Sequence, residues 1–248
     1  MTCPIVVMAV SRGRPQSVRP YMDWFFDTSE GLSKVVWCLD RDDPKLEEYV
    51  FSIKTLREKP VFGQRLDFVI KPRMGLGGST NNLAMELVDH YQILGEVCDD
   101  FRFRTIGWDS RVYEVFSSWP DRTGLVFCND LLQKDKLATE VFISSNLVKT
   151  MGFFALPTLR HLYRDNFYMV IGRGLGRLKY LDDVIIEHMH PLAGKASWDA
   201  GYRENNTPEM YSKDGGAFNF WLERESFNFI EQLKMKLNIS YGFSSLQR

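Results

Sequence analysis

The sequence predicts an α/β protein, with one domain built on a sheet of mainly parallel strands and helices on both faces. Three observations lead to this class. Over the first hundred residues, short apolar runs alternate with segments of helical periodicity. The connections between them are short, as in units that join parallel strands through a helix. Finally, no internal repeat, low-complexity tract or linker divides the 248 residues.

The first half is expected to contain four buried strands separated by helices. The expected strands are residues 5–10, 35–39, 66–70 and 93–98. Pro15 and the Asp43-Pro44 pair favour the starts of the first two helices, because proline fits the first helical turn. The glycine-rich stretch 75–79 is expected to be a flexible loop, with Ser79 or Thr80 capping the third helix.

The second half is less regular. Strands are expected at residues 125–127, 141–143 and 184–186, and helical segments at 162–172 and 218–233. Ser144 or Ser145 is a candidate cap for a short helix that ends at Met151. The glycine-rich stretch 172–176 follows a helical segment and lacks the GxGxxG spacing, so it is not predicted to be a dinucleotide-binding loop.

Composition narrows the possible functions. Lys and Arg number 31 and Asp and Glu 32, and this net charge of −1 argues against nucleic-acid binding through bulk charge. The four cysteines (Cys3, Cys38, Cys98 and Cys128) have no CxxC spacing and are expected to be free thiols in a reducing compartment. With no apolar stretch near about 18 residues and no signal-peptide pattern, the chain is expected to be cytoplasmic, without a membrane span.

Polar groups follow three of the expected strands, at residues 11–14, at Asp40 and at the pair Asp99-Asp100. Ligands collect at the carboxyl ends of parallel strands, so these groups should share one rim of the sheet. Adjacent carboxylates repel each other unless a cation or a donor compensates, and their oxygens suit Mg²⁺ or Mn²⁺. A solvated acidic loop explains the pair equally well.

Two of the four histidines, His188 and His190, lie within three residues directly after an apolar run. Positions i and i+2 of a strand point to the same side, so either histidine could join the carboxylates around one metal. The alternative is a pair of capping or packing histidines before Pro191.

Two basic groups fit either solvated helix faces or a groove for an anionic acceptor such as DNA. The aromatic residues Tyr163, Phe167 and Tyr168 could stack on a base or belong to the core. The first group comprises Lys54, Arg57, Lys59, Arg65, Lys71 and Arg73, and the second comprises Arg160, Arg164, Arg173, Arg177 and Lys179.

Five short strings occur in an order that resembles a known family. They are residues 11–15 (SRGRP), 39–44 (LDRDDP), Asp99-Asp100 followed by 104–109 (RTIGWD), 161–166 (HLYRDN) and 187–191 (EHMHP). Over roughly residues 4–200, the chain resembles the family-2-like nucleotide-diphospho-sugar glycosyltransferases of the GT-A fold found in bacteria and phages. The resemblance implies a Rossmann-like mixed sheet in one domain, 1–248. Its nucleotide-sugar-binding half would be about 1–110 and its acceptor-binding half about 111–248.

The resemblance also implies roles for individual residues. Metal would be held by Asp100 with His188 or His190, but the usual Asp-x-Asp motif reads Cys98-Asp99-Asp100 here, which leaves metal dependence open. If the enzyme inverts, Asp165 would be the general base, and its alternative role is as a partner of His161. The donor nucleotide would contact Ser11, Arg12, Arg14, Asp40, Asn81, Asn82 and Asp99.

The implied reaction transfers a sugar from a nucleotide-diphosphate donor, with a UDP-sugar expected, to an acceptor hydroxyl with the help of Mn²⁺ or Mg²⁺. The acceptor, which could be a modified DNA base of a phage, a protein or a glycan, stays open, as does the oligomeric state. A phage enzyme would act in the host cytoplasm.

Two other functions are compatible with the sequence. One is a sugar-phosphate nucleotidyltransferase of similar fold, whose Gly-x-Gly-Thr-Arg loop is replaced here by residues 11–15. The other is a metal-dependent nuclease or nucleic-acid-binding protein that uses the paired acids and histidines.

Overall fold

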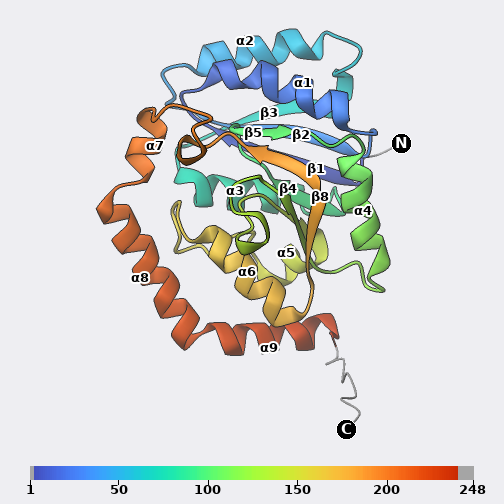
Figure 1. Ribbon diagram of the computed structural model, residues 1–248, viewed down its shortest axis with the longest axis vertical. Helices are drawn as coiled ribbons and strands as arrows, with labels where there is room; N and C mark the ends of the chain where they lie inside the picture. Colours follow the sequence, from blue (N-terminus) through green and yellow to red (C-terminus); the bar gives the residue numbers. More distant parts are fainter. Residues whose placement is uncertain (1–2, 240–248) are drawn as a thin grey trace.

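The computed structural model describes residues 3–239, and its eight strands lie in the order β3-β2-β1-β4-β7-β6-β8-β5 (Figure 1). Strands β1 to β4 are parallel, β7 is antiparallel to both of its neighbours, β8 is parallel to β6, and β5 is antiparallel to β8. The strands are β1 (Ile5–Ser11), β2 (Ser33–Asp40), β3 (Leu66–Lys71), β4 (Ile93–Glu96), β5 (Phe101–Phe103), β6 (Leu125–Asn129), β7 (Val141–Ser144) and β8 (Leu178–His188). The predicted α/β class with a mixed sheet is confirmed.

Helices cover both faces of this sheet, as Figure 1 shows. Alternate residues of β1 point to opposite faces: Ile5, Val7 and Ala9 pack against α1, α2 and α4, whereas Val6 and Met8 face α3, α5 and α6. Helices α8 and α9 form an outer layer against α6. The helices are α1 (Val18–Thr28), α2 (Leu46–Arg57), α3 (Gly75–Leu87), α4 (Trp108–Ser118), α5 (Ser145–Met151), α6 (Arg164–Leu175), α7 (Ala200–Asn205), α8 (Pro208–Arg224) and α9 (Ser226–Leu237).

The third helix differs from its prediction, because α3 begins at Gly75 and contains the stretch that was expected to be a loop. The backbone of Gly77 donates to the carbonyl of Arg160, and a Cβ at residue 77 would lie 2.3 Å from the carbonyl oxygen of Leu159. A glycine is therefore needed for close approach between two segments and not for flexibility. Ser79 and Thr80 are interior helix residues, so neither is its N-cap.

Two further boundaries were wrong. Helix α2 starts at Leu46, and the Asp43 carboxylate accepts both from the backbone amide of Lys45, just before the helix, and from that of Gly13. The expected segment 218–233 belongs to two helices, α8 and α9, which meet at Glu225.

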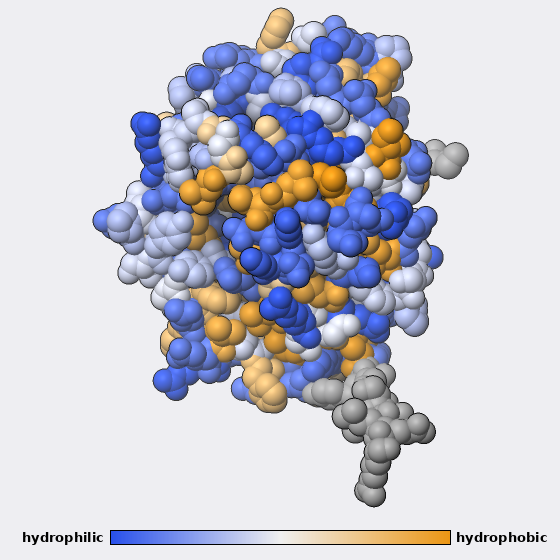
Figure 2. Space-filling model, in the orientation of Figure 1, coloured by the Kyte–Doolittle hydropathy of each residue, from blue (hydrophilic) through white to orange (hydrophobic). Residues whose placement is uncertain are grey.

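All four cysteines are free thiols, as expected. Among residues 3–239, no helix is long and apolar enough to cross a membrane. On the face seen in Figure 2, hydrophobic side chains form small patches separated by hydrophilic ones.

Candidate functional site

The candidate site lies at the carboxyl ends of the parallel strands. Ser11 and Asp40 end β1 and β2, and Asp99 follows β4. Strand β8 is parallel to β6 and therefore runs in the same direction as β4, so its last residue, His188, reaches the same rim. The topology thus brings together side chains that are up to 177 positions apart in the sequence.

A chain of hydrogen bonds fixes the loop after β1. The backbone amide of Arg14 donates to the hydroxyl of the fully buried Tyr49, at 2.7 Å. That hydroxyl pairs with the hydroxyl of Ser11, which in turn donates to the Asp99 carboxylate. From the other side, the Asp43 carboxylate accepts from the backbone of Gly13, where φ is +75°. The loop after β1 is therefore held in one conformation by buried partners.

Arg14 is the cation at the centre of the rim. Its guanidinium lies 3.1 Å from Asp99 and 3.9 Å from Asp100, and it forms two hydrogen bonds with Asp199. Burial lowers the pKa of Arg14, but the hydrogen bond of Asp199 and the charges of the three carboxylates outweigh it and raise that pKa. Arg14 consequently stays protonated and compensates the repulsion between the two adjacent acids.

The two adjacent carboxylates have different environments. Burial and the charge of Asp100 raise the pKa of Asp99 above its ordinary range. Burial also acts to raise the pKa of Asp100, but hydrogen bonds from His188 and Tyr202 and the charge of Arg14 outweigh it and lower that pKa. Asp100 is therefore the more strongly ionised of the two, as a cation ligand would need to be.

Asp100 and His188 are the two residues at the rim that could hold a divalent cation. His188 Nε2 lies 3.5 Å from Asp100 Oδ2. Two buried atoms, Asp100 Oδ1 and His188 Nδ1, have no hydrogen-bond partner among the described residues. Within residues 3–239, no three or more His, Cys, Asp or Glu side chains are grouped as a metal site. Because Mg²⁺ keeps several waters and also takes substrate phosphates, two protein ligands suffice.

His190 is placed differently from His188. Strand β8 ends at His188, so the alternation of side chains along a strand does not extend to His190. Its Nδ1 accepts from the backbone amide of Leu192, and its ring packs edge-on against His188. Its proposed role as a metal ligand remains a prediction, with one ring nitrogen already engaged.

At the β2 end of the rim, Asp40 accepts from Arg12 at 3.2 Å, and the Arg73 guanidinium lies 4.0 Å away. Burial raises the pKa of Asp40, although Arg12 opposes the shift. Arg12 also pairs with Asp42. This part of the rim therefore offers a carboxylate and two cations to a polar ligand.

Asp165 lies in the first turn of α6 beside the buried Arg164. Burial raises the pKa of Asp165 to about 6, and the positive charges of Arg164 and His188 act against this shift. A half-buried carboxyl with a pKa near 6 can take up a proton near neutral pH. The alternative role of Asp165 is as a partner of His161, but the backbone amide of His161 donates to another acid, the buried Asp214.

Two predicted nucleotide contacts, Asn81 and Asn82, are not brought into this cluster by any hydrogen bond that the described residues make. Asn81 uses its amide to donate to the carbonyl of Ala155 and to accept from two backbone amides at residues 154 and 155. Asn82 is exposed. Their contact with a nucleotide remains a prediction.

Several members of the two basic groups pair with nearby acids or lie in the core. Arg57 pairs with Asp67, Lys71 pairs with Glu86, and Arg164 lies in the core beside Glu96. The aromatic residues Phe167 and Tyr168 are also buried in the core. These three cations are neutralised by local ion pairs, and the contacts give the phage DNA acceptor no support.

Sequence reasoning missed the contribution of the segment that contains α7. Asp199, Tyr202 and Glu204 contact Arg14, Asp100 and Arg73, respectively. No motif in the sequence marks these residues, and the contacts arise only because the segment after β8 folds back across the rim.

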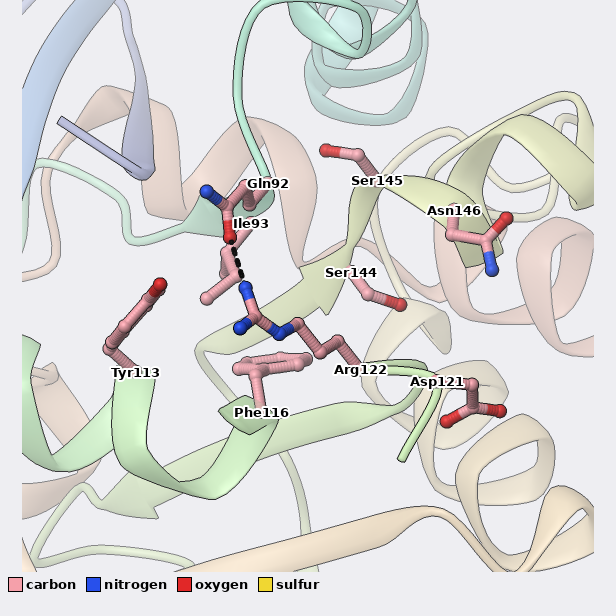
Figure 3. Close-up of a pocket in the computed structure, with 9 residues that line it drawn as sticks. All are labelled: Gln92, Ile93, Tyr113, Phe116, Asp121, Arg122, Ser144, Ser145 and Asn146. Atoms are coloured by element: carbon pink, nitrogen blue, oxygen red, sulfur yellow. Dashed lines mark hydrogen bonds between the residues drawn. The ribbon is translucent and has the colours of Figure 1, made fainter. Parts of the chain in front are cut away.

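A separate pocket lies at the opposite edge of the sheet, where β4 begins and β7 ends (Figure 3). Several of its polar side chains already have partners: Arg122 donates to Gln92, and Asn146 donates to Thr123. None of the candidate site residues lines this pocket, so the rim is the better candidate for catalysis.

Comparison with known proteins agrees with this topology. No protein-family model and no curated protein matches the chain. Among solved structures, a mannosyltransferase, PcManGT from Pyrobaculum calidifontis in complex with GDP-Man and Mn²⁺, matches with a TM-score of 0.58 and 13% identity, over 95% of this chain and 75% of that chain. S. aureus TarS 1-349 in complex with UDP matches with a TM-score of 0.56 and 9% identity, over 96% and 75% of the two chains.

TarS 1-349 in complex with UDP-GlcNAc gives a TM-score of 0.53 at 10% identity, over 94% of this chain and 82% of that chain. Identities this low establish a common fold and nothing finer. The chain has the GT-A-like fold of nucleotide-sugar glycosyltransferases.

Proposed function

We propose that this protein is a metal-dependent glycosyltransferase that moves a sugar from a UDP- or GDP-sugar to an acceptor hydroxyl. The observation that carries the proposal is the pair Asp100 and His188, whose buried, unpartnered atoms lie at the carboxyl rim of a GT-A-like sheet beside the fixed Arg14. The two nucleotides are those bound by the structural neighbours named above.

In this proposal the donor lies along the rim from Asp40 to Asp100. Arg12 and Arg14 pair with the phosphates, and Asp40 and Asp99 accept hydrogen bonds from the base or ribose. A divalent cation held by Asp100 and His188 would neutralise charge on the departing diphosphate. The donor half is about 1–110 and the acceptor half about 111–248, with His188 reaching back to the donor side.

Asp165 is the proposed general base if the transfer inverts configuration. Its carboxylate would accept the proton of the acceptor hydroxyl as the hydroxyl oxygen bonds to the sugar carbon and the diphosphate departs. A pKa of about 6 leaves most of this carboxyl ionised near neutral pH. If the transfer retains configuration, Asp165 would instead hold the donor sugar.

Calorimetric titration with UDP, GDP and their sugars, with and without Mn²⁺, tests the proposal. We expect binding that depends on Mn²⁺ and that Asp100→Asn weakens by at least about tenfold, the usual scale for damage to a metal site. Asp23→Asn is the matched control, because Asp23 pairs with Arg19 within α1 and takes part in none of the rim contacts described above. The proposal fails if no nucleotide or nucleotide-sugar binds, or if Asp100→Asn binds like the unaltered protein.

Activity assays separate the alternatives. Release of a labelled nucleoside diphosphate from a nucleotide-sugar panel supports the proposal. Pyrophosphate release from a nucleoside triphosphate and a sugar phosphate would indicate a nucleotidyltransferase. Degradation of DNA with Mg²⁺ alone would indicate a nuclease, and both results contradict the proposal.

A further inference from the structure

The segment 199–204 contacts three rim residues at once. Asp199 forms two hydrogen bonds with the Arg14 guanidinium, at 2.6 and 2.9 Å. The hydroxyl of Tyr202 donates to Asp100 Oδ2 at 2.6 Å. Glu204 pairs with Arg73, whose guanidinium also lies 4.0 Å from Asp40. The segment therefore spans the rim from the β4 end to the β2 end.

Arg14 is the main attachment point of this segment. Its guanidinium lies over the ring of Tyr202, 4.3 Å from the ring centroid. The backbone passes so close that a Cβ at Gly201 would lie 3.3 Å from Arg14 Nη2. Asp199 is also the N-cap of α7, because it accepts from the backbone amide of Tyr202. One carboxylate thus caps the start of α7 and also joins this helix to Arg14 at the rim.

The chemistry of these contacts matches that of a donor. Two carboxylates hold two arginines, and a phenol covers one oxygen of the candidate cation ligand Asp100. A nucleoside diphosphate carries anionic oxygens that would pair with the same arginines, and a cation would need the same carboxylate. In the observed arrangement Asp199 occupies the Nε and Nη2 edge of the Arg14 guanidinium, and Asp99 takes a donor on Nη1, so a diphosphate could pair with that two-donor edge only by displacing Asp199.

We propose that α7 is an internal competitor of the donor: Asp199 and Glu204 occupy Arg14 and Arg73 until a nucleoside diphosphate displaces them. The inference rests on the proposed function and adds Arg73 to the donor-binding residues. Since only the released state binds, the apparent Kd equals the intrinsic Kd divided by the fraction of molecules in which α7 is released.

Asp199→Asn is the sharpest variant. Asparagine is as good an N-cap as aspartate, so α7 keeps its start while the contact with Arg14 loses its negative charge. The Arg14 and Asp199 side chains are 19% and 36% exposed, so the ion pair is partly solvated. We therefore expect the Kd for UDP or GDP with Mn²⁺ to fall about two- to fivefold. Glu204→Gln should lower it in the same direction, and Asp23→Asn should leave it unchanged.

Hydrogen–deuterium exchange of the α7 amides supplies a readout that does not need the reaction. Exchange should rise in Asp199→Asn without ligand, and in the unaltered protein when UDP or GDP is added with Mn²⁺. Two results would overturn the proposal that α7 competes with the donor while leaving the proposed function standing. One is that Asp199→Asn binds the nucleotide no more tightly than the unaltered protein does, and the other is that the nucleotide protects the α7 amides from exchange. If neither nucleotide binds any variant, the proposed function fails, and the competitor fails with it.

Discussion

Glu96→Gln should destabilise the fold strongly, because Glu96 is the acceptor at the centre of a buried polar cluster. Its carboxylate pairs with Arg164 through both oxygens. It also accepts from the hydroxyls of Thr80 and Tyr168, each at 2.8 Å. All four residues are at most 6% exposed. Glutamine provides one oxygen in place of two, and its NH₂ group would face donors.

The magnitude follows from the burial of the charge. Arg164 is 2% exposed, and its Nε has no hydrogen-bond partner among the described residues. Losing Glu96 leaves this cation in the core without a counter-charge, which costs about 3–5 kcal/mol in comparable cases. By contrast, Asp23→Asn should change the free energy of unfolding by about 0.5 kcal/mol or less, because the Arg19–Asp23 pair is exposed.

Urea unfolding, followed by circular dichroism, measures both values. A double variant, Glu96→Gln with Arg164→Met, removes both partners and should be more stable than the sum of the single effects predicts, by about 1–3 kcal/mol. The reasoning is wrong if Glu96→Gln loses less than about 1 kcal/mol, or if the single effects simply add.

Two other predictions concern backbone packing and pH. Gly77→Ala should lower the free energy of unfolding by about 1–3 kcal/mol, because its Cβ would meet the Leu159 carbonyl oxygen at 2.3 Å. Gly216→Ala should raise it by about 0.5–1 kcal/mol, because that helical glycine has open space around its Cβ position; equal urea midpoints for the two variants would contradict both. If Asp165 is the base, the rate of sugar transfer should fall as the pH drops through about 6, where the carboxyl becomes protonated, and an initial-rate profile that is flat between pH 5 and 8 would exclude that role.

The first half of the fold was predictable because its signals are local. The four parallel strands are short apolar runs, and the acids and arginines of the rim directly follow three of them. The start of α3 was not predictable. A glycine is needed at residue 77 because the backbone of residue 159 passes too close for a side chain. That constraint comes from a segment about 80 positions away, which the local sequence does not reveal. A glycine-rich stretch on its own is therefore interpreted as a loop.

The second half contributes to the site through tertiary contacts that local patterns do not encode. The pattern of two histidines after an apolar run already marked His188 as a candidate, but its position beside Asp100 depends on β8 pairing in parallel with β6. The contact between Arg14 and Asp199 joins residues 185 positions apart. A charged residue in a short polar segment usually predicts a solvated surface, so nothing marked Asp199 in advance.

Helix α6 shows how neighbouring residues can serve the core and the site separately. It begins after Tyr163, whose φ of +61° lies in the left-handed region. Arg164 then enters the core and pairs with Glu96, whereas Asp165 stays half-buried where the charge of His188 influences its pKa. The buried ion pair fixes the first turn of α6, and that turn sets the position of Asp165. A buried charge that is costly on its own therefore fixes a helix start next to Asp165, the proposed general base.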